Sequence, residues 1–179
     1  MNRHFIDLTS VAINGRILDV GGGGEGVIGR QYGDAVVAID IRKDELAETS
    51  GAGLKIVMDA ADMQFVDCQF DAVTCFYSLM YMKQDVFEKA ISEAQRVLKP
   101  GGCLYIWDTE ISFEPSDESF VAQLDVQMTN ERITPGFGMY WNRGQSAQSV
   151  LDTCTRAGFA CTQNTSANGA ICLVLQKIC

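Results

Sequence analysis

Apolar and polar positions along the chain follow two alternating patterns. Short, almost continuous apolar runs occur at 16–20, 35–40, 55–59, 70–76 and 102–108. Such runs are typical of strands in a parallel sheet that is covered on both faces. Between them lie stretches with helical spacing, so the pattern predicts a doubly wound α/β domain.

The clearest helical stretch covers 85–102. Its apolar residues recur on one face, at Phe87, Ile91, Ala94 and Leu98. Asp85 and Glu88 stand three positions apart, which resembles a capping box and predicts a helix start at Asp85. The Pro-Gly-Gly run at 100–102 would stop the helix before the fifth strand.

The pattern changes after Asp108. Residues 119–130 alternate strictly between apolar and polar, which predicts a half-exposed strand, and 132–142 has the composition of its hairpin partner. We therefore expect 109–145 to be a β insertion after strand 5, placed on the substrate side of the sheet.

The end of the chain returns to the earlier pattern. Residues 146–159 have helical spacing, and two further apolar runs flank the pair Asn168-Gly169, which is a strong hairpin signal. The expected fold is a mostly parallel seven-stranded sheet whose last strand is antiparallel, in one domain spanning 1–179.

A glycine cluster follows the first predicted strand and fits two nucleotide motifs. Gly21, Gly23 and Gly26 satisfy GxGxxG, the pattern of dinucleotide-binding folds. Asp19 with Gly21 and Gly23 gives Asp-x-Gly-x-Gly instead. A carboxylate beside a pyrophosphate is unfavourable, whereas a ligand carrying an ammonium group would favour it. Asp19 therefore argues for the second motif.

The sequence resembles the class I S-adenosyl-methionine-dependent methyltransferases over nearly its whole length. The resemblance rests on Asp19 to Gly23 and on the segments 36–41, 58–65, 70–82 and 96–106. It departs from the family pattern at Glu25, where many members have a third glycine. The implied fold is Rossmann-like, the implied cofactor is S-adenosyl-methionine, and the implied activity is methyl transfer.

The resemblance and the spacing together give candidate cofactor-binding residues. The turn needs bare backbone at Gly21, Gly22 and Gly23, and Asp19 would take the amino-acid end of the ligand. Asp40 lies 19 residues after Gly21, where a carboxylate accepts hydrogen bonds from ribose hydroxyls. The remaining candidates come from the family pattern or from their place at strand ends: Ile41, Asp59, Ala60 and Phe76.

The sequence evidence for acceptor-binding residues is less specific than the evidence for cofactor-binding residues. Candidate acceptor-binding residues are Tyr77, Asp108, Tyr140 and Trp141, and no residue is assigned a catalytic role. Asp108, Tyr77 and Glu110 are candidate bases if the acceptor needs deprotonation. The only histidine, His4, is expected to be exposed near the terminus. The segment before the first predicted strand is too short for a helical cap, so the site is expected to be open or closed by a partner subunit, such as a second copy in a homodimer.

The composition of the chain limits which partners, metal sites and locations are expected. The chain of 179 residues carries a formal net charge of −9, which makes nucleic acid an unfavourable partner and favours a small-molecule acceptor. Its seven cysteines show no CxxC spacing, so no metal site is expected. With no apolar run long enough for a membrane span, we expect a cytoplasmic protein. Two alternatives stay open: a non-catalytic S-adenosyl-methionine-binding regulator and an NAD(P)-dependent oxidoreductase.

Overall fold

A seven-stranded sheet forms the centre of the computed structural model, which describes residues 2–112, 120–139 and 143–178. Its strands are β2 (Ile17–Val20), β3 (Val36–Asp40), β4 (Leu54–Val57), β5 (Phe70–Phe76), β6 (Leu98–Thr109), β10 (Phe159–Asn164) and β11 (Ala170–Lys177). Their order is β10-β11-β6-β5-β2-β3-β4. Strands β2 to β6 pair in parallel, and β11 is antiparallel to β6 and β10. The predicted α/β fold with an antiparallel last strand is confirmed.

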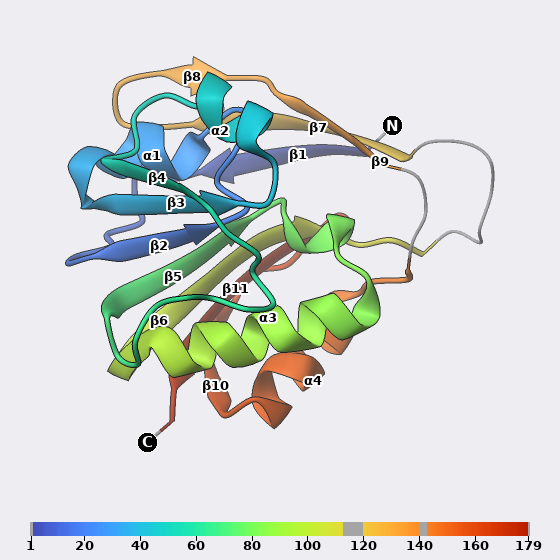
Figure 1. Ribbon diagram of the computed structural model, residues 1–179. Helices are drawn as coiled ribbons and strands as arrows, with labels where there is room; N and C mark the ends of the chain where they lie inside the picture. The colour runs from blue at the N-terminus through green and yellow to red at the C-terminus, as the bar shows by residue number, and fades with distance from the viewer. Residues whose placement is uncertain (1, 113–119, 140–142, 179) are drawn as a thin grey trace.

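Two helices cover one face of this sheet, α3 (Gln84–Val97) and α4 (Ala147–Arg156) (Figure 1). The apolar face predicted for α3 is buried against the sheet. The predicted capping box is wrong, because the helix is capped at Lys83 and no side chain bonds its first turn. The helix also ends at Val97, and the Pro-Gly-Gly run lies inside β6.

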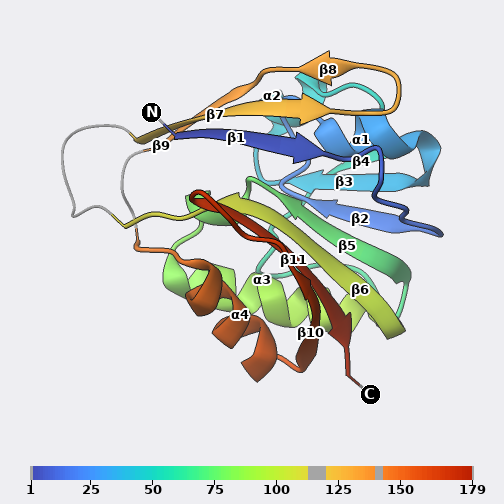
Figure 2. The ribbon, with the colours of Figure 1, turned by 180° about the vertical axis from the view of Figure 1, so that it is seen from behind.

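A second, smaller sheet lies on the opposite face. It contains β1 (Asn2–Asp7), β7 (Phe120–Gln127), β8 (Arg132–Ile133) and β9 (Gly136–Met139). The predicted β insertion is therefore confirmed for its described residues. Strand β1 runs parallel to β7 along its whole length, with His4 opposite Leu124 (Figure 2). The N-terminal segment thus adds a strand to the insertion, an arrangement that the sequence analysis did not predict.

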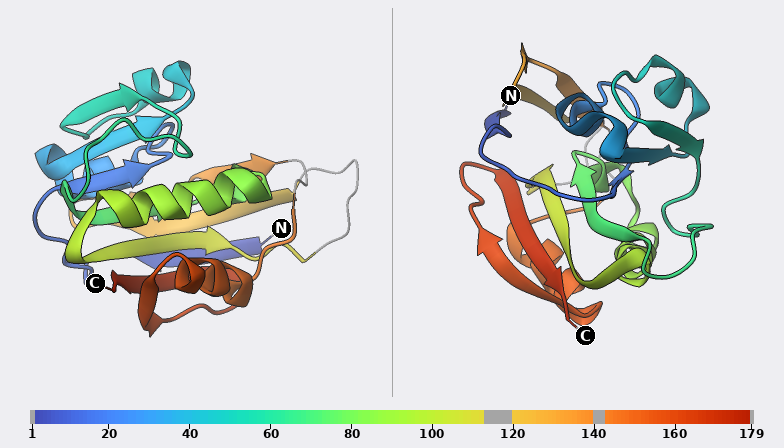
Figure 3. Two further views of the ribbon diagram at one scale, coloured as in Figure 1. Left: turned by 60° about the horizontal axis from the view of Figure 1, so that its bottom comes forward. Right: turned by 90° about the vertical axis from the view of Figure 1, so that its left-hand side faces the viewer.

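The layers are held by two apolar cores. One core lies between the main sheet and α3 with α4, and the other lies under the second sheet. The left view of Figure 3 looks onto α3 and α4, with the main sheet behind them and β1 and β7 further back. The second core also contains α1 (Val27–Tyr32), whose Tyr32 hydroxyl donates to the Val11 carbonyl.

The remaining short elements lie at the connections. They are the 3-10 turns η1 (Gly33–Ala35) and η2 (Leu79–Tyr81) and the helix α2 (Lys43–Glu48). The predicted hairpin between β10 and β11 is confirmed, since Asn168 and Gly169 both have positive φ, 53° and 80°. Positive φ at both central residues is what a two-residue hairpin turn requires.

Candidate cofactor and acceptor site

Three of the predicted site carboxylates lie at one edge of the main sheet. Asp19 is near the end of β2, Asp40 is the last residue of β3, and Asp59 follows the end of β4. Because these strands are parallel neighbours, their carboxyl ends meet at the same edge. Ligands of open α/β sheets bind at this edge, where the strand order reverses between β2 and β5.

Asp19 is a buried carboxyl group with a specific partner. It is 2% exposed, and the Thr74 hydroxyl donates to its Oδ1 over 2.7 Å. Burial raises the pKa of Asp19 to about 7, against the lowering effect of the Thr74 hydrogen bond, and the nearby Asp40 charge raises it further. Burying a carboxylate is costly, so such a group is typical of functional sites.

The glycine turn packs closely around these carboxylates. Gly21 has φ of 74°, and a Cβ atom there would lie 2.4 Å from the Ser78 Cβ. A Cβ at Gly22 would lie 2.6 Å from the Asp19 Oδ2. Only glycine fits at these two positions, because such separations are shorter than any van der Waals contact. The turn therefore exposes backbone directly beside Asp19.

Asp40 orders the next part of the turn. Its Oδ2 accepts a hydrogen bond from the Gly23 amide over 3.3 Å, and its Oδ1 accepts one from the Arg42 amide over 2.9 Å. Ile41 is 68% exposed, which is unusual for a large apolar side chain beside a candidate ligand site. Across the edge, Asp59 is exposed and accepts from the Ala61 amide, and Ala60 is half-buried.

The end of β5 connects this edge to the second sheet. Phe76 and Tyr77 are buried in the second core, and Tyr77 has φ of 50°. The Tyr77 ring stacks on Phe137 of β9 with centroids 5.4 Å apart. Its hydroxyl lies 2.8 Å from the His4 Nδ1. His4 is only 2% exposed, so the expectation of an exposed histidine is wrong.

Asp108 lies at the centre of a buried hydrogen-bond network. Its Oδ2 accepts from the Leu79 and Met80 amides, and its Oδ1 accepts from the Thr109 amide and from Gln145 Nε2. Burial raises the pKa of Asp108 to about 6, although these hydrogen bonds lower it. These four hydrogen bonds connect the residues after β5 with the end of the insertion.

Arg143 extends the same network. Its guanidinium donates to the carbonyls of Leu79 and Met82, each over 3.0 Å, and it lies 4.4 Å from the centroid of the Phe87 ring. It also donates to Gln145 Oε1. Glu110, the other candidate base, accepts from the Ala147 amide at the start of α4. The candidates Tyr140 and Trp141 lie outside the described residues.

Comparison with known proteins gives the family. Residues 18–106, which include the glycine turn, Asp40, Asp59 and Tyr77, match a family described as methyltransferase domain. Residues 18–106 belong to this methyltransferase domain family, and the chain has the fold of S-adenosyl-methionine-dependent methyltransferases. The match covers the part of the chain that carries the predicted cofactor residues.

Individual relatives of the chain carry the names of different methyltransferases. It is 34% identical to a fatty-acid O-methyltransferase of Mycolicibacterium smegmatis over 65% of this chain and 46% of that protein. It is 31% identical to a ubiquinone/menaquinone biosynthesis C-methyltransferase of Stutzerimonas stutzeri over 69% of this chain and 52% of that protein. The chain thus spans about half the length of these curated relatives. A SAM-dependent methyltransferase structure from Methanosarcina mazei superposes with a TM-score of 0.63, at 20% identity, over 94% of each chain.

Several residues of the candidate site were not identified from the sequence. Thr74 and Ser78 lie in a predicted strand and loop, but nothing in their spacing marks them as partners of Asp19 and of the Val20 carbonyl, to which the Ser78 hydroxyl donates. His4 was missed as well. His4, Ile6 and Leu8 are buried in alternation with the exposed Arg3, Phe5 and Asp7, but the apolar Phe5 hides this period of two in the sequence. That period of two is typical of a strand with one buried face.

Membrane-spanning helices and metal-binding groups are both absent from the described residues of the chain. None of their helices combines the length and the apolar composition that crossing a bilayer requires. No group of three His, Cys, Asp or Glu side chains within 2–112, 120–139 and 143–178 is arranged to hold a metal ion.

Proposed function

We propose that this chain binds S-adenosyl-methionine at the carboxyl edge of β2, β3 and β4 and transfers its methyl group to a small-molecule acceptor. One observation carries the proposal: the buried carboxyl group of Asp19 lies directly against the glycine turn, with Asp40 beside it. A pyrophosphate at this turn would face two carboxylates, which disfavours the NAD(P)-dependent alternative.

The residues at this edge fit the proposed cofactor. Asp19 would bind the amino-acid end, and Gly21, Gly22 and Gly23 would let the backbone approach it. A Cβ at Gly23 would lie 2.7 Å from the Asp40 Oδ2, so bare backbone is needed here too. Asp40 would accept hydrogen bonds from the ribose hydroxyls through the lone pairs that Gly23 and Arg42 leave free.

The adenine would lie between β3 and β4. Ile41, exposed in the protein alone, would pack on the ring face and lose apolar surface to the ligand. Asp59 and the Ala60 amide would recognise the ring edge. Phe76 would border the sulfonium end, although its ring also packs against Trp107 at 5.9 Å.

Bound S-adenosyl-methionine supplies an electrophilic methyl group with a good leaving group. The chain has to align an acceptor with it, and alignment alone contributes several kcal/mol. We propose that the insertion 109–145 and Tyr77 form the acceptor side, with Tyr140 and Trp141 as candidate contacts. The Asp108 carboxylate already accepts hydrogen bonds from amides of the chain, which supports a positioning role for it rather than acceptor contact.

The charge and the relatives support a small acceptor. The net charge of −9 disfavours nucleic acid, and the names of the relatives refer to a fatty acid and to quinones. We propose that 1–179 acts as one domain in the cytoplasm. Because β1 and β7 already cover one side of the Tyr77 region, a homodimer is not required to close it.

Methyl transfer can be tested directly. Purified protein is incubated with S-adenosyl-methionine tritiated on the methyl group and with single acceptors: dodecanoic acid, 2-naphthol, a menaquinol precursor such as 1,4-dihydroxy-2-naphthoic acid, and an amine control. Labelled product with at least one acceptor supports the enzyme. Tight cofactor binding with no transfer to any of them would instead support the non-catalytic regulator.

A further inference from the structure

His4 and Tyr77 form a contact between the two sheets at the candidate site. The Tyr77 hydroxyl meets the His4 Nδ1 of β1 at 2.8 Å, and the Tyr77 ring stacks on Phe137 of β9. The next residue, Ser78, packs directly against Gly21 of the glycine turn. A chain of contacts through Tyr77 and Ser78 therefore links the histidine to the cofactor turn.

The other ring nitrogen of His4 has no partner. Its Nε2 is one of two buried side-chain nitrogen or oxygen atoms in the described part of the chain that make no hydrogen bond. Leaving such an atom buried without a partner is costly, because it loses its hydrogen bond to water. Native proteins retain that cost where a ligand supplies the missing partner, and the unpaired atom belongs to a residue touching Tyr77, a candidate acceptor contact.

We propose that His4 is the general base of the methyl transfer, and that its Nε2 takes the proton of a phenol or enol hydroxyl on the acceptor. The proposal rests on the proposed function and adds the acceptor class to it. A carboxylic acid is already ionised at neutral pH and needs no base, whereas a phenol does. The unpaired nitrogen therefore favours the phenol or enol class.

His4, the acceptor and the sulfonium account for every bond that forms and breaks in the proposed step. The Nδ1–H donates to the Tyr77 oxygen, which leaves the Nε2 lone pair free for the acceptor. The acceptor O–H gives its proton to Nε2, and its oxygen bonds the methyl carbon. The bond from that carbon to sulfur breaks and leaves its electron pair on sulfur. The resulting imidazolium is stabilised by the Tyr77 oxygen and loses its proton to water on product release.

The surroundings keep the pair in the forms this role needs. Burial lowers the pKa of His4, so its ring is neutral at pH 7 and able to accept a proton. Burial also raises the pKa of Tyr77, with smaller contributions from Asp108 and Cys172, so Tyr77 stays protonated. The charged residues of β7 and β8, Asp125 and Arg132, bind each other.

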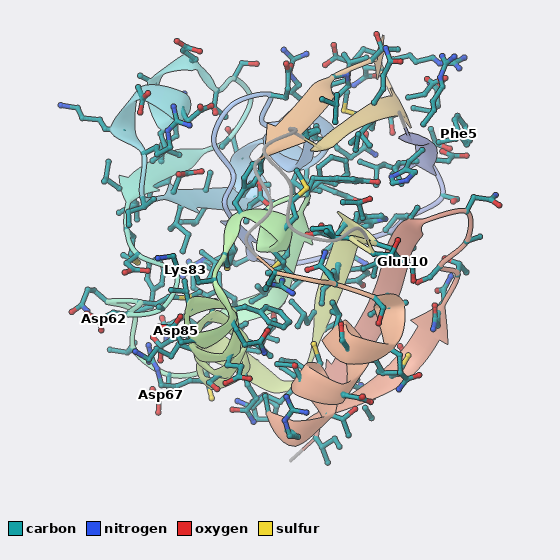
Figure 4. All side chains as sticks on the ribbon, turned by 90° about the vertical axis from the view of Figure 1, so that its right-hand side faces the viewer. Phe5, Asp62, Asp67, Lys83, Asp85 and Glu110 are labelled. Atoms are coloured by element: carbon teal, nitrogen blue, oxygen red, sulfur yellow. The ribbon has the colours of Figure 1, made fainter. Side chains whose placement is uncertain are left out.

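Substitution separates this role from cofactor binding. The variant His4→Phe should lower kcat/KM for 2-naphthol at pH 7.5 by at least 100-fold, the usual loss for a general base. Its affinity for S-adenosyl-homocysteine, measured by calorimetry, should stay within twofold of the parent protein. The matched control is Phe5→Leu, one position along β1, where the side chain is 62% exposed and lies at the margin of the fold (Figure 4). It should leave both values unchanged.

A second measurement does not depend on a variant that folds. His4 is the only histidine, so tag-free protein labelled with ¹⁵N gives one imidazole spectrum. With S-adenosyl-homocysteine bound, 2-naphthol should shift the Nε2 resonance, while Tyr77→Phe should lower the pKa read from the same resonance.

The proposal is overturned if S-adenosyl-homocysteine binds but 2-naphthol is not methylated. It is also overturned if 2-naphthol does not shift the Nε2 resonance. Methylation of 2-naphthol by the His4→Phe variant at the rate of the parent protein would overturn it as well. Failure of S-adenosyl-homocysteine to bind would instead remove the proposed function itself.

Discussion

Replacing Asp19 by Asn should make the protein more stable and a weaker binder of its proposed cofactor. The folded protein raises the pKa of Asp19 from 3.8 to about 7, mainly through burial. Each unit corresponds to about 1.36 kcal/mol, so the ionised carboxylate at pH 8 destabilises the fold by roughly 4 kcal/mol. Asn carries no charge and its oxygen can still accept the hydrogen bond of Thr74. We expect a net gain of about 2–4 kcal/mol, which for a domain of this size is roughly 4–16 °C in Tm.

The raised pKa of Asp19 determines the direction in which the free energy of unfolding changes with pH. Between about pH 4 and pH 7 the folded protein holds a proton on Asp19 that the unfolded chain has lost. The contribution of Asp19 to the free energy of unfolding is therefore greatest below about pH 4 and falls as pH rises through about 7. Asp108, whose pKa is raised to about 6, adds to this fall in both proteins. The difference between parent and variant isolates Asp19.

Urea unfolding at pH 5 and pH 8, without ligand, measures both effects. The control is Asp34→Asn, an exposed position that removes the same charge, since lowering the net charge of −9 is itself stabilising. The stability gained by Asp19→Asn should be larger at pH 8 than at pH 5. S-adenosyl-homocysteine should raise the Tm of the variant less than that of the parent. If the Asp19→Asn protein is no more stable than Asp34→Asn at pH 8, then the buried carboxylate of Asp19 does not destabilise the fold and the prediction is wrong.

Three further predictions concern the turn and the buried network. Asp40→Ala should weaken S-adenosyl-methionine binding at least tenfold, because the ribose loses its acceptor; unchanged affinity in calorimetry would count against the assignment. Gly22→Ala places a Cβ 2.6 Å from the Asp19 Oδ2, so the turn must shift and affinity should fall by a similar factor while the far-ultraviolet spectrum stays the same. Gln145→Leu removes donors to Asp108 and to the Thr109 carbonyl and should cost about 1–3 kcal/mol in urea unfolding. The exposed Gln148→Leu is its control, and equal losses in the two variants would contradict the network.

Much of the main sheet was predictable because its strands are continuous apolar runs. The site carboxylates Asp19 and Asp40 stand at the ends of such runs, so their edge could also be predicted. Long-range pairings were not, since the parallel pairing of β1 with β7 joins segments more than 100 positions apart. No local pattern specifies that pairing. The burial of His4 depends on it and was predicted wrongly for that reason.

The network around Asp108 shows a second kind of limit. Its donors come from η2, from its own strand and from Gln145, and each was an ordinary polar or backbone group in the sequence. The N-cap of α3 lies at Lys83, two positions before Asp85, so residue type alone misplaced the start of this helix by two residues.

We propose that the turn beside Asp19 receives an adenosyl ligand with an amino group and no pyrophosphate. Calorimetric titration of the purified chain with S-adenosyl-homocysteine, and separately with NAD, tests it most directly. We expect saturable one-to-one binding of S-adenosyl-homocysteine and no heat of binding with NAD. Binding of NAD in preference to S-adenosyl-homocysteine, or binding of neither, would contradict it.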